Sequence, residues 1–180
     1  MVNYKAKFSI VKNCKIGKNS IIKDFTDIYK AEIGDNCKIH SFVYIEEGVK
    51  IGNNVIVRPH SVITEKITIG DNVFIGQNVQ TVNDLYPNTK KRAKILKTQI
   101  KKNAIIGTGS TIFPVIIGMN SFIAAGSVVT KDVPDYALIV GNPGRVMGWV
   151  NKKGKKIIFD TQGNSQCNEY KMTEGRVIEI

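Results

Sequence analysis

A chain of 180 residues, 42% of them hydrophobic, is long enough for one domain with appendages, and no apolar run in it could span a bilayer. The formal net charge of +11 suits a polyanionic partner, but aromatic residues do not interleave with the lysine clusters as a nucleic-acid platform requires. We therefore expect neither nucleic-acid binding nor membrane insertion. The first residues lack the apolar core of a signal peptide, which predicts a cytoplasmic location.

An isoleucine or valine recurs every sixth residue through the first half of the chain. A period of six fits neither an amphipathic helix nor an alternating strand, so each hexad is interpreted as a short strand followed by a sharp corner. Three hexads would close one triangular coil of a solenoid. The first set comprises Ile10, Ile16, Ile22 and Ile28, and the main run comprises Ile33, Ile39, Ile45, Ile51, Val57, Ile63, Ile69 and Ile75.

The corners carry the residues that a sharp turn requires. In phrases such as Ile51-Gly52-Asn53-Asn54, a glycine follows the repeated isoleucine and an asparagine stands two residues beyond the glycine. Both residue types tolerate positive φ. The fourth residue after each isoleucine is small or β-branched, which suits a narrow prism. An antiparallel sandwich with glycine-rich turns is the alternative, but it would not keep eight hexads in one phase.

The register is interrupted at three places. One residue is missing after Ile28 and another after Ile112, and the pattern stops over residues 82–99, a polar segment rich in turn formers. We predict that this segment is an extruded loop, and loops held by a rigid scaffold commonly carry function. The predicted domains are a solenoid over residues 1–132 and a C-terminal strap with a strand cap over residues 133–180.

The C-terminal segment is predicted to form short strands that shield an open end of the solenoid. They are placed at residues 156–159, 169–172 and 176–180, with a turn at residues 173–175. Cys14 and Cys37 fall at the compact inward position of their hexads and are interpreted as core residues. The tail keeps a single thiol, Cys167, which cannot make a tetrahedral zinc site, so no metal is expected.

The hexads resemble those of the hexapeptide-repeat acyltransferases, as do Ala124-Ala125-Gly126-Ser127-Val128-Val129-Thr130-Lys131-Asp132-Val133-Pro134 and Val140-Gly141-Asn142-Pro143. The resemblance covers residues 10 to about 150. It implies an all-β fold, a left-handed parallel β-helix with an extruded loop and a C-terminal strand cap. The left hand comes from the family alone, because general sheet stereochemistry favours right-handed crossovers.

Two further segments, residues 81–87 and 139–150, are similar to a branch of this family that N-acetylates amino sugars carried on nucleotides. For this chain the similarity implies acetyl-CoA as the acyl donor and a UDP- or dTDP-linked amino sugar, with the amine at C3, as the acceptor. The product would serve surface polysaccharide synthesis. The resemblance also implies a homotrimer, with acetyl-CoA bound in grooves between neighbouring prisms.

The same resemblance assigns the cofactor-binding residues. Backbone amides near Gly107, Ala125 and Gly126 are expected to hold the pantetheine arm and the thioester carbonyl. Lys131 and Arg145 are expected to meet the CoA phosphates, which suits the excess of positive charge. A solvated surface cation is the alternative interpretation of both side chains.

Acetyl transfer requires an uncharged amine near the thioester carbon, donors for the developing oxyanion and an acceptor for the amine proton. Many relatives place a histidine near the loop, whereas this chain has Asn83 and Asp84 there. The resemblance assigns Asp84 to orient the amine or accept its proton, and Asn83 to hydrogen-bond the sugar. An Asx turn that starts the loop is the structural alternative.

The chain contains two histidines. His60 precedes Asn78 by eighteen residues, and we expect it one coil below Asn78, near the root of the loop, where it could act as a base or contact the nucleotide. The sequence leaves open whether Asp84, His60 or water takes the amine proton. Candidate substrate contacts are Arg58, Gln77, Tyr86 and His40, the last of which is otherwise a surface residue.

Two departures from the family pattern concern the cofactor region. Pro114 is followed by Val115 rather than the usual glycine, and Gly144 replaces the usual alanine. Other functions also remain open. An O-acetyltransferase would need a stronger base than an Asn-Asp pair. A zinc carbonic anhydrase on the same prism would need three histidines, and a scaffold or ice-binding solenoid would show regular threonine ladders and no extruded loop.

Overall fold

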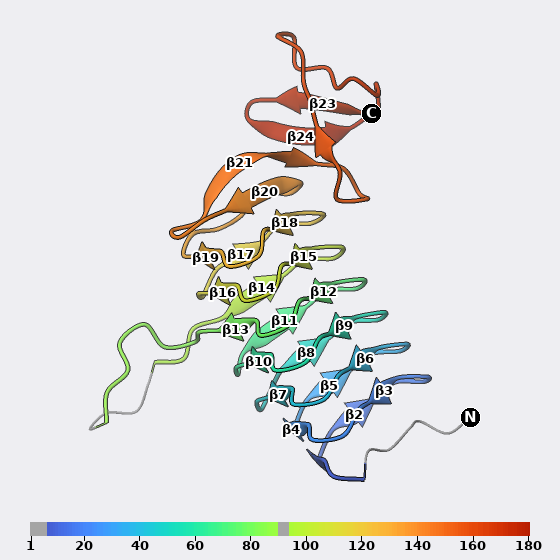
Figure 1. Cartoon of the computed structure of the whole chain (residues 1–180), viewed down its shortest axis with the longest axis vertical. Coiled ribbons are helices and arrows are strands. Elements are labelled where there is room, and N and C mark those ends of the chain that lie inside the picture. The colour runs from blue at the N-terminus through green and yellow to red at the C-terminus, as the bar shows by residue number, and fades with distance from the viewer. Residues whose placement is uncertain (1–6, 90–93) are drawn as a thin grey trace.

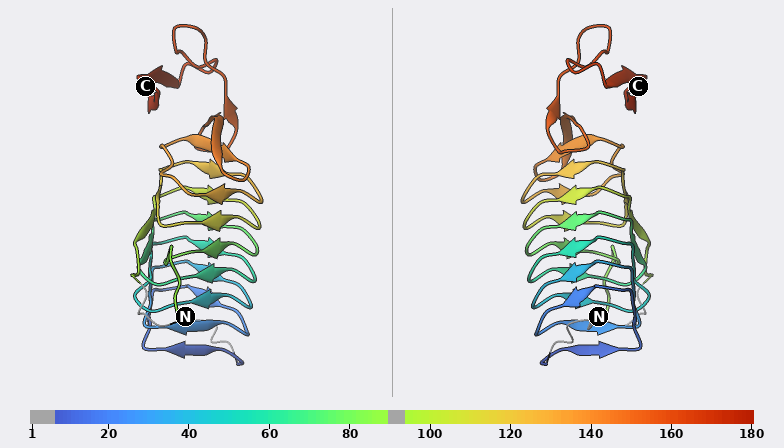
Figure 2. Two further views of the ribbon diagram at one scale, coloured as in Figure 1. Left: turned by 90° about the vertical axis from the view of Figure 1, so that its left-hand side faces the viewer. Right: turned by 90° about the vertical axis from the view of Figure 1, so that its right-hand side faces the viewer.

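The structure, a computed structural model, describes residues 7–89 and 94–180 and forms a solenoid of stacked triangular coils (Figure 1). The first six residues and residues 90–93 of the predicted loop lie outside this description. Each complete coil contributes one short strand to each of three parallel sheets, here named A, B and C. The strands of successive coils lie directly above one another (Figure 2). The six-residue period therefore does correspond to a strand and a corner.

Within the described residues the strands divide among the sheets as follows. Sheet A has the order β1 (Ile10–Lys12), β4 (Asp27–Tyr29), β7 (Tyr44–Ile45), β10 (Val62–Ile63), β13 (Gln80–Thr81), β16 (Thr111–Ile112) and β19 (Val128–Val129). Sheet B has β2 (Lys15–Ile16), β5 (Glu32–Ile33), β8 (Lys50–Ile51), β11 (Ile67–Ile69), β14 (Thr98–Ile100) and β17 (Ile116–Ile117). Sheet C has β3 (Ile21–Ile22), β6 (Lys38–Ile39), β9 (Ile56–Val57), β12 (Phe74–Ile75), β15 (Ile105–Ile106) and β18 (Phe122–Ile123), followed by β20 (Ala137–Val140), β21 (Arg145–Val150) and β22 (Lys156–Ile157).

The repeated isoleucines and valines form the core because they point into the prism in every coil. Ile45 lies opposite Ile63 in sheet A, and both are fully buried. Since successive coils are in register, each inward side chain stacks on a side chain of similar shape one coil away. The resulting columns bury apolar surface along the whole solenoid, which is the main stabilising term of the fold.

The corner between sheets B and C is built on a column of asparagines. Six of them have φ between 56° and 60°, the left-handed region that asparagine tolerates: Asn19, Asn36, Asn54, Asn72, Asn103 and Asn120. Their side-chain amides bond to one another, for example from Asn72 Nδ2 to Asn103 Oδ1 at 3.0 Å and from Asn103 Nδ2 to Asn120 Oδ1 at 2.8 Å. The prediction that these residues shape the corners is confirmed.

The sequence register was wrong in the first coil. Ile10, assigned to the inward column, is 51% exposed and lies opposite Asp27, whereas Val11 lies opposite Ile28. The corner after Val11 has five residues, like the one predicted after Ile28, so the register slips at both corners and not only at the second. The corner at Pro114 is of the same type, and it closes with Val115 buried in the core.

The C-terminal segment continues sheet C before it leaves the solenoid. β20, within the predicted strap, pairs in parallel with β18, and β21 turns back antiparallel to β20. Beyond β22, the hairpin of β23 (Tyr170–Thr173) and β24 (Arg176–Glu179) turns through the predicted residues 173–175. Its Tyr170 packs edge-on against Tyr136 with ring centroids 5.7 Å apart. Among the described residues, none belongs to a helix long and apolar enough to cross a membrane.

Replacing Asn72 separates the two contributions of the asparagine column. Asn72→Ala loses the bonds to Asn54 and Asn103 and places a Cβ-bearing residue without a polar group at φ +57°. We expect it to lower the free energy of unfolding by about 2 kcal/mol. Asn72→Gly loses only the side-chain bonds and should cost about 1 kcal/mol. Urea unfolding of both variants measures the difference, and equal losses would show that the φ value contributes nothing.

Candidate active site

Most of the predicted site residues lie on one edge of the prism, the corner between sheets C and A, which we call the C–A corner. Its columns are fixed by backbone bonds between coils, such as Arg58 N to Ile75 O at 3.0 Å and Gly107 N to Ile123 O at 2.8 Å. Successive coils are about 4.8 Å apart. The corner thus brings together, from low to high coils, His40, Arg58, His60, Gln77, Gly107, Ala125 and Gly126.

The upper coils of the C–A corner present free backbone donors. At the corner between sheets B and C, four of the five amides that follow a glycine are capped by a side chain of the next coil, as in Asn53 N to Asp71 Oδ1 at 2.6 Å. The exception among the described residues is Asp71 N, because the next coil has Lys102 at the capping position. The equivalent amides at the C–A corner belong to Gln77, Thr108 and Ala125, which are exposed. Over residues 7–89 and 94–180 the structure gives these three N–H groups no acceptor. They form a column of donors along the corner.

The same coils are almost bare of side chains. Gly109 and Gly126 have φ of +70°, and a Cβ added to either would meet no atom within 4 Å. A Cβ on Gly107 would lie 2.5 Å from Ala125 N, because the coils approach closely there. At Gly109 and Gly126 an extended ligand can therefore approach the corner without meeting a side chain of these residues. Sequence reasoning named Gly107, Ala125 and Gly126 but missed Thr108. The free amide of Thr108 could have been found from the sequence, because the next coil has no Asp or Asn at the capping position.

Lys131 and Arg145 lie together at the top of the solenoid. Both line a pocket of about 210 Å³ whose other lining residues include Val129, Ile139 and Gly144. The Arg145 guanidinium donates to Gly144 O at 3.0 Å, which leaves most of its donors available. A methyl group on Gly144 would lie 2.8 Å from Ile139 Cγ2, which explains why glycine replaces the usual alanine.

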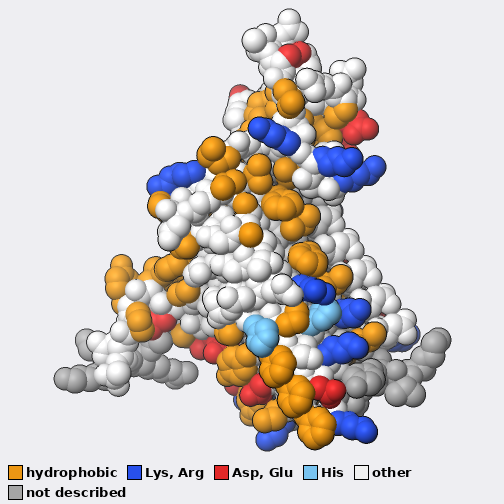
Figure 3. All heavy atoms as spheres, in the orientation of Figure 1, with side chains coloured by type: hydrophobic (Ala, Val, Ile, Leu, Met, Phe, Trp, Pro, Cys, Tyr) orange, Lys and Arg blue, Asp and Glu red, His pale blue; other side chains and the backbone are white. Residues whose placement is uncertain are grey.

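The lower coils of the C–A corner carry an exposed aromatic stack of Phe8, Phe25, Phe42 and His60. The ring centroids are 5.7, 5.2 and 4.9 Å apart, and the rings are within 8° of parallel. His60 adopts φ +63° and lies just below Asn78, as predicted, since Gln80 Nε2 donates to both His60 O and Asn78 Oδ1. The expectation that it also lies near the root of the loop is wrong, because the loop starts at the other end of β13. Figure 3 shows both histidines on this face, above a row of hydrophobic side chains.

His40 lies one coil below Arg58, and the two side chains touch. Arg58 Nη1 is 3.5 Å from His40 Nε2. Partial burial lowers the pKa of His40 below its usual 6.5, and the positive charges of Arg58, Lys38 and Lys23 lower it further. The imidazole is therefore neutral at physiological pH and accepts rather than donates at the nitrogen that faces Arg58.

The loop residues lie elsewhere. Asn83, Asp84 and Tyr86 follow β13, at the end of that strand opposite the C–A corner, and the loop projects away from the prism (Figures 1 and 2). Asp84 Oδ1 accepts from Tyr86 N at 2.9 Å, which is the Asx turn named as the structural alternative. Leu96 N donates to Asn83 O at 2.8 Å and ties the returning chain to the loop's root. One chain therefore does not bring these residues to Gly107, Ala125 and Gly126, whereas Lys131 follows β19 two coils above them at the same end of sheet A.

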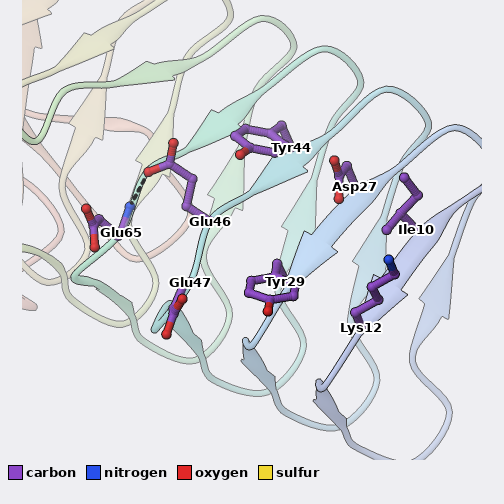
Figure 4. Close-up of a pocket in the computed structure, with 8 residues that line it drawn as sticks. All are labelled: Ile10, Lys12, Asp27, Tyr29, Tyr44, Glu46, Glu47 and Glu65. Carbon is purple, nitrogen blue, oxygen red and sulfur yellow. Dashed lines mark hydrogen bonds between the residues drawn. The ribbon is translucent and has the colours of Figure 1, made fainter. Parts of the chain in front are cut away.

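A second hollow, of about 460 Å³, lies on the lower coils of sheet A and was missed by sequence reasoning (Figure 4). Its acidic lining consists of Asp27, Glu46, Glu47 and Glu65, and Glu65 N donates to Glu46 Oε2 at 2.9 Å. Burial raises the pKa of Tyr44 in the same pocket, and the charges of Glu46 and Asp27 raise it further. Among the described residues no group of His, Cys, Asp and Glu side chains is arranged to hold a metal ion.

Two family models match this chain. The model described as bacterial transferase hexapeptide (six repeats) matches residues 30–65, and that of the hexapeptide repeat of succinyl-transferase matches residues 9–45, 66–81 and 98–131. Together they cover more than half of the chain. The chain belongs to the hexapeptide-repeat transferases. The predicted all-β fold, a left-handed parallel β-helix, is thereby confirmed.

Curated relatives match parts of this hexapeptide-repeat chain. The dTDP-3-amino-3,6-dideoxy-α-D-galactopyranose 3-N-acetyltransferase of Aneurinibacillus thermoaerophilus is 45% identical over 87 residues, which are 47% of this chain and 45% of the relative. The bifunctional protein GlmU of Clostridium botulinum is 34% identical over 143 residues, 78% of this chain and 26% of the relative. The matched segments thus span less than half of each relative.

Solved structures of the family agree with the fold. AntD, an N-acyltransferase from Bacillus cereus solved with dTDP and 3-hydroxybutyryl-CoA, has a TM-score of 0.69 and 28% identity, covering 77% of this chain and 84% of that one. PerB from Caulobacter crescentus, solved with CoA and GDP-perosamine, has a TM-score of 0.63 at 21% identity, covering 72% and 57%. The PerB likeness concerns the fold alone.

The electrostatic environment of His40 can be tested directly. Arg58→Gln removes a positive charge beside the ring, so the protonated form becomes less unfavourable and the pKa of His40 should rise toward 6.5 while burial still holds it lower. Proton NMR titration of the imidazole measures the change. Lys50→Gln, an equal change of charge on sheet B, should leave the pKa of His40 unaltered. An unchanged pKa in Arg58→Gln would contradict the contact.

Proposed function

We propose that the protein is an acetyl-CoA-dependent N-acetyltransferase that acts on the C3 amine of a UDP- or dTDP-linked sugar in the cytoplasm, for surface polysaccharide synthesis. The observation that carries the proposal is the column of free amides at Gln77, Thr108 and Ala125 on an otherwise bare corner. The 45% identity to a dTDP-3-amino sugar 3-N-acetyltransferase supports the acceptor class.

Acetyl-CoA fits the upper C–A corner in an extended conformation. Its amide and thioester carbonyls are acceptors, and the free N–H groups are spaced one coil apart to meet them. The phosphates would lie in the pocket of about 210 Å³ at the top of the solenoid. Lys131 and Arg145 provide positive charge there, and Asp132 is the one acidic residue in its lining. The thioester would then lie lower on the corner, near Gln77 and Gly107.

Transfer then needs no covalent enzyme intermediate. The sugar nitrogen attacks the thioester carbon, a C–N bond forms, and the C–S bond breaks as the electron pair leaves on the CoA sulfur. A free backbone N–H of the corner donates to the oxyanion as it develops. The nitrogen loses a proton, which Asp84 accepts directly or through water, while Asn83 hydrogen-bonds the sugar. His60 is the second candidate acceptor.

Asn83 and Asp84 reach this chemistry only in an assembly. In one chain they lie at the end of β13 opposite the C–A corner, and the loop leaves the prism. A homotrimer, in which the loop of one copy extends to the C–A corner of the next, would complete a site at each of its interfaces. The loop supports this arrangement because it projects from the prism, while its root is held by the bond from Leu96 N to Asn83 O and by Lys66 Nζ, 3.4 Å from Ile95 O.

The reaction class is tested with matched acceptors. The protein is incubated with acetyl-CoA and either a dTDP-linked 3-amino-3,6-dideoxyhexose or the corresponding 3-hydroxy sugar, and free thiol is measured. We expect thiol release with the amine only, because a hydroxyl must lose a much more tightly held proton and the site offers a carboxylate rather than a histidine at the loop. Release with the hydroxy sugar alone would replace the proposal by an O-acetyltransferase.

The chemical role of Asp84 is separated from its turn by two variants. Asp84→Asn keeps an oxygen that can accept from Tyr86 N, whereas Asp84→Ala removes both the turn bond and the carboxylate. If the carboxylate takes part in proton transfer, both should lower kcat by about 10²- to 10⁴-fold. The melting temperature and the oligomeric state should change little in Asp84→Asn. Turnover that survives in Asp84→Asn would leave only the structural role.

A further inference from the structure

We propose that Thr81 is a positioning residue. Its buried hydroxyl takes the place of a backbone carbonyl in the bonding between coils and so directs Asn83 and Asp84 out of the prism. The inference rests on the proposed function, in which Asn83 and Asp84 act on the amino sugar, and adds to it the residue that sets their place. Thr81 is 6% exposed, so it acts through the chain that follows it rather than on a substrate.

Thr81 interrupts a column of apolar side chains in the core. It is the last residue of β13 and lies at the inward position of sheet A, directly before the loop (Figure 1). Over the described residues, the other members of this inward column are all apolar: Val11, Ile28, Ile45, Ile63, Ile112 and Val129. Burying a hydroxyl among them lowers stability unless hydrogen bonds compensate for the lost water. The hydrogen bonds of Thr81 should therefore explain its presence in this column.

The hydroxyl of Thr81 is fully hydrogen-bonded. Its Oγ1 donates to Val62 O at 3.1 Å and accepts from Thr64 N at 2.8 Å, and Thr64 Oγ1 lies 2.9 Å away. Because a hydroxyl carries one hydrogen and two lone pairs, the Thr64 hydroxyl is the donor in the contact between the two side chains. Both partner residues belong to the coil below. The three bonds fasten the end of β13 to the corner that follows β10.

The bond from Thr64 N differs from the equivalent bonds in other coils. In those coils the residue after a strand of sheet A donates to a backbone carbonyl of the next coil. Examples are Glu46 N to Ile63 O at 2.9 Å, Val82 N to Ile112 O at 2.8 Å and Phe113 N to Val129 O at 3.0 Å. The equivalent acceptor for Thr64 N is Thr81 O, but the bond goes to the Thr81 hydroxyl instead. The side chain thus satisfies the donor below and leaves the carbonyl able to turn with the departing loop.

The strand pairing changes at the same residue. β10 pairs with β7 through both Val62 and Ile63, but with β13 only through Val62 and Gln80. β13 pairs regularly with the coil above, where Thr81 lies opposite Ile112. The backbone therefore leaves the regular path on the lower side of Thr81, where the hydroxyl has replaced the carbonyl. The acceptor and the pairing both place the departure at this residue.

Asn83 and Asp84 start from this fixed point. Val82 N bonds to the coil above, and the carbonyl of Asn83 is tied to the returning chain. Asp84 then forms its Asx turn. A rotation of the peptide between Thr81 and Val82 would be passed to the Asp84 carboxylate three residues along the chain. Because a displacement of about 1 Å in a reacting group can cost about 10²-fold in rate, the hydroxyl matters to the reaction without touching a substrate.

Replacement by valine separates this role from packing. Valine suits an apolar column, so Thr81→Val should keep the fold. It offers no acceptor to Thr64 N, however, and a buried donor without a partner is costly. The donor regains a partner if the carbonyl of residue 81 turns back to the position that it has in other coils, and that turn redirects Asn83 and Asp84. We therefore expect a folded protein with a misplaced loop root.

Steady-state kinetics with acetyl-CoA and a dTDP-linked 3-amino-3,6-dideoxyhexose test the assignment. Thr81→Val should lower kcat at least about tenfold and leave the KM for acetyl-CoA unchanged, because the free amides of the C–A corner are not altered. Thr81→Ser keeps the hydroxyl and should recover most of the loss. Thr68→Val is the matched control, the same change on the exposed face of β11, and should alter neither constant. A wild-type kcat in Thr81→Val would overturn the assignment.

Two further variants isolate the connection to Asp84. In the Asp84→Ala background, Thr81→Val should lower kcat little further, because the carboxylate that it misplaces is already gone. An equal loss in both backgrounds would show that Thr81 acts independently and would overturn the positioning role. Thr81→Cys, whose thiol is a weaker acceptor, covers the case in which Thr81→Val does not fold. It should also lower kcat, and a wild-type kcat would contradict the assignment.

The outcomes separate this role from the proposed function. If the wild-type protein acetylates the amine and Thr81→Val does so equally fast, the role of Thr81 is wrong while the proposed function stands. If the wild-type protein acetylates no amino sugar, the proposed function fails, and NMR of the Asn83 and Asp84 backbone amides still measures the loop root. Signals that shift in Thr81→Val and not in Thr81→Ser support the positioning role, and signals unchanged in both variants overturn it.

Discussion

The stacking of each coil on the next in register is the constraint on which the rest of the molecule depends. Backbone bonds such as Gly107 N to Ile123 O hold every residue above its equivalent, so a residue type repeated in the sequence becomes a column in space. Columns of isoleucine make the core, and columns of asparagine make one corner. Since a column runs the length of the solenoid, a change of composition within it creates two surfaces with different chemistry on one edge.

The candidate site lies where the residue composition changes within the columns of one corner. The two corners that flank sheet C use the same turn geometry, with left-handed residues at Asn72 on one and at Asn78 on the other. At the asparagine corner, side chains such as Asp71 cap most of the amides at the position after the glycine. In the six coils with an asparagine, the described residues leave only the amides of Asp71 and Lys102 at this position without an acceptor. At the C–A corner the caps are missing and glycines replace large side chains, so the backbone N–H groups of Gln77, Thr108 and Ala125 are open to a ligand. The proposed function depends on this absence of caps.

Much of the fold could be predicted because the period of six is a local property of the chain. The same period predicted the position of His60 under Asn78, and both lie there. The inward position in the first coil was wrong, because Ile10 and Val11 are both apolar and only the length of the corner between them and Ile16 decides which one is buried. The location of the loop residues, away from the C–A corner, could not be predicted, because a repeat period carries no information about the conformation of an insertion. The contact of His40 with Arg58 and the acidic pocket depend on which columns of residues lie side by side. This is known only when each residue has been assigned to its coil.

The aromatic stack and the bare glycine column share one corner, and the distance between them is set by whole coils. Pro59 and Thr108 are two steps apart, which is about 10 Å, and no smaller adjustment is open to a solenoid that must keep its register. The distance between any two binding positions on this edge can therefore change only in steps of one whole coil. A family built in this way can change the reach between donor and acceptor by gaining or losing a coil of 17 or 18 residues, while every other contact of the scaffold is kept.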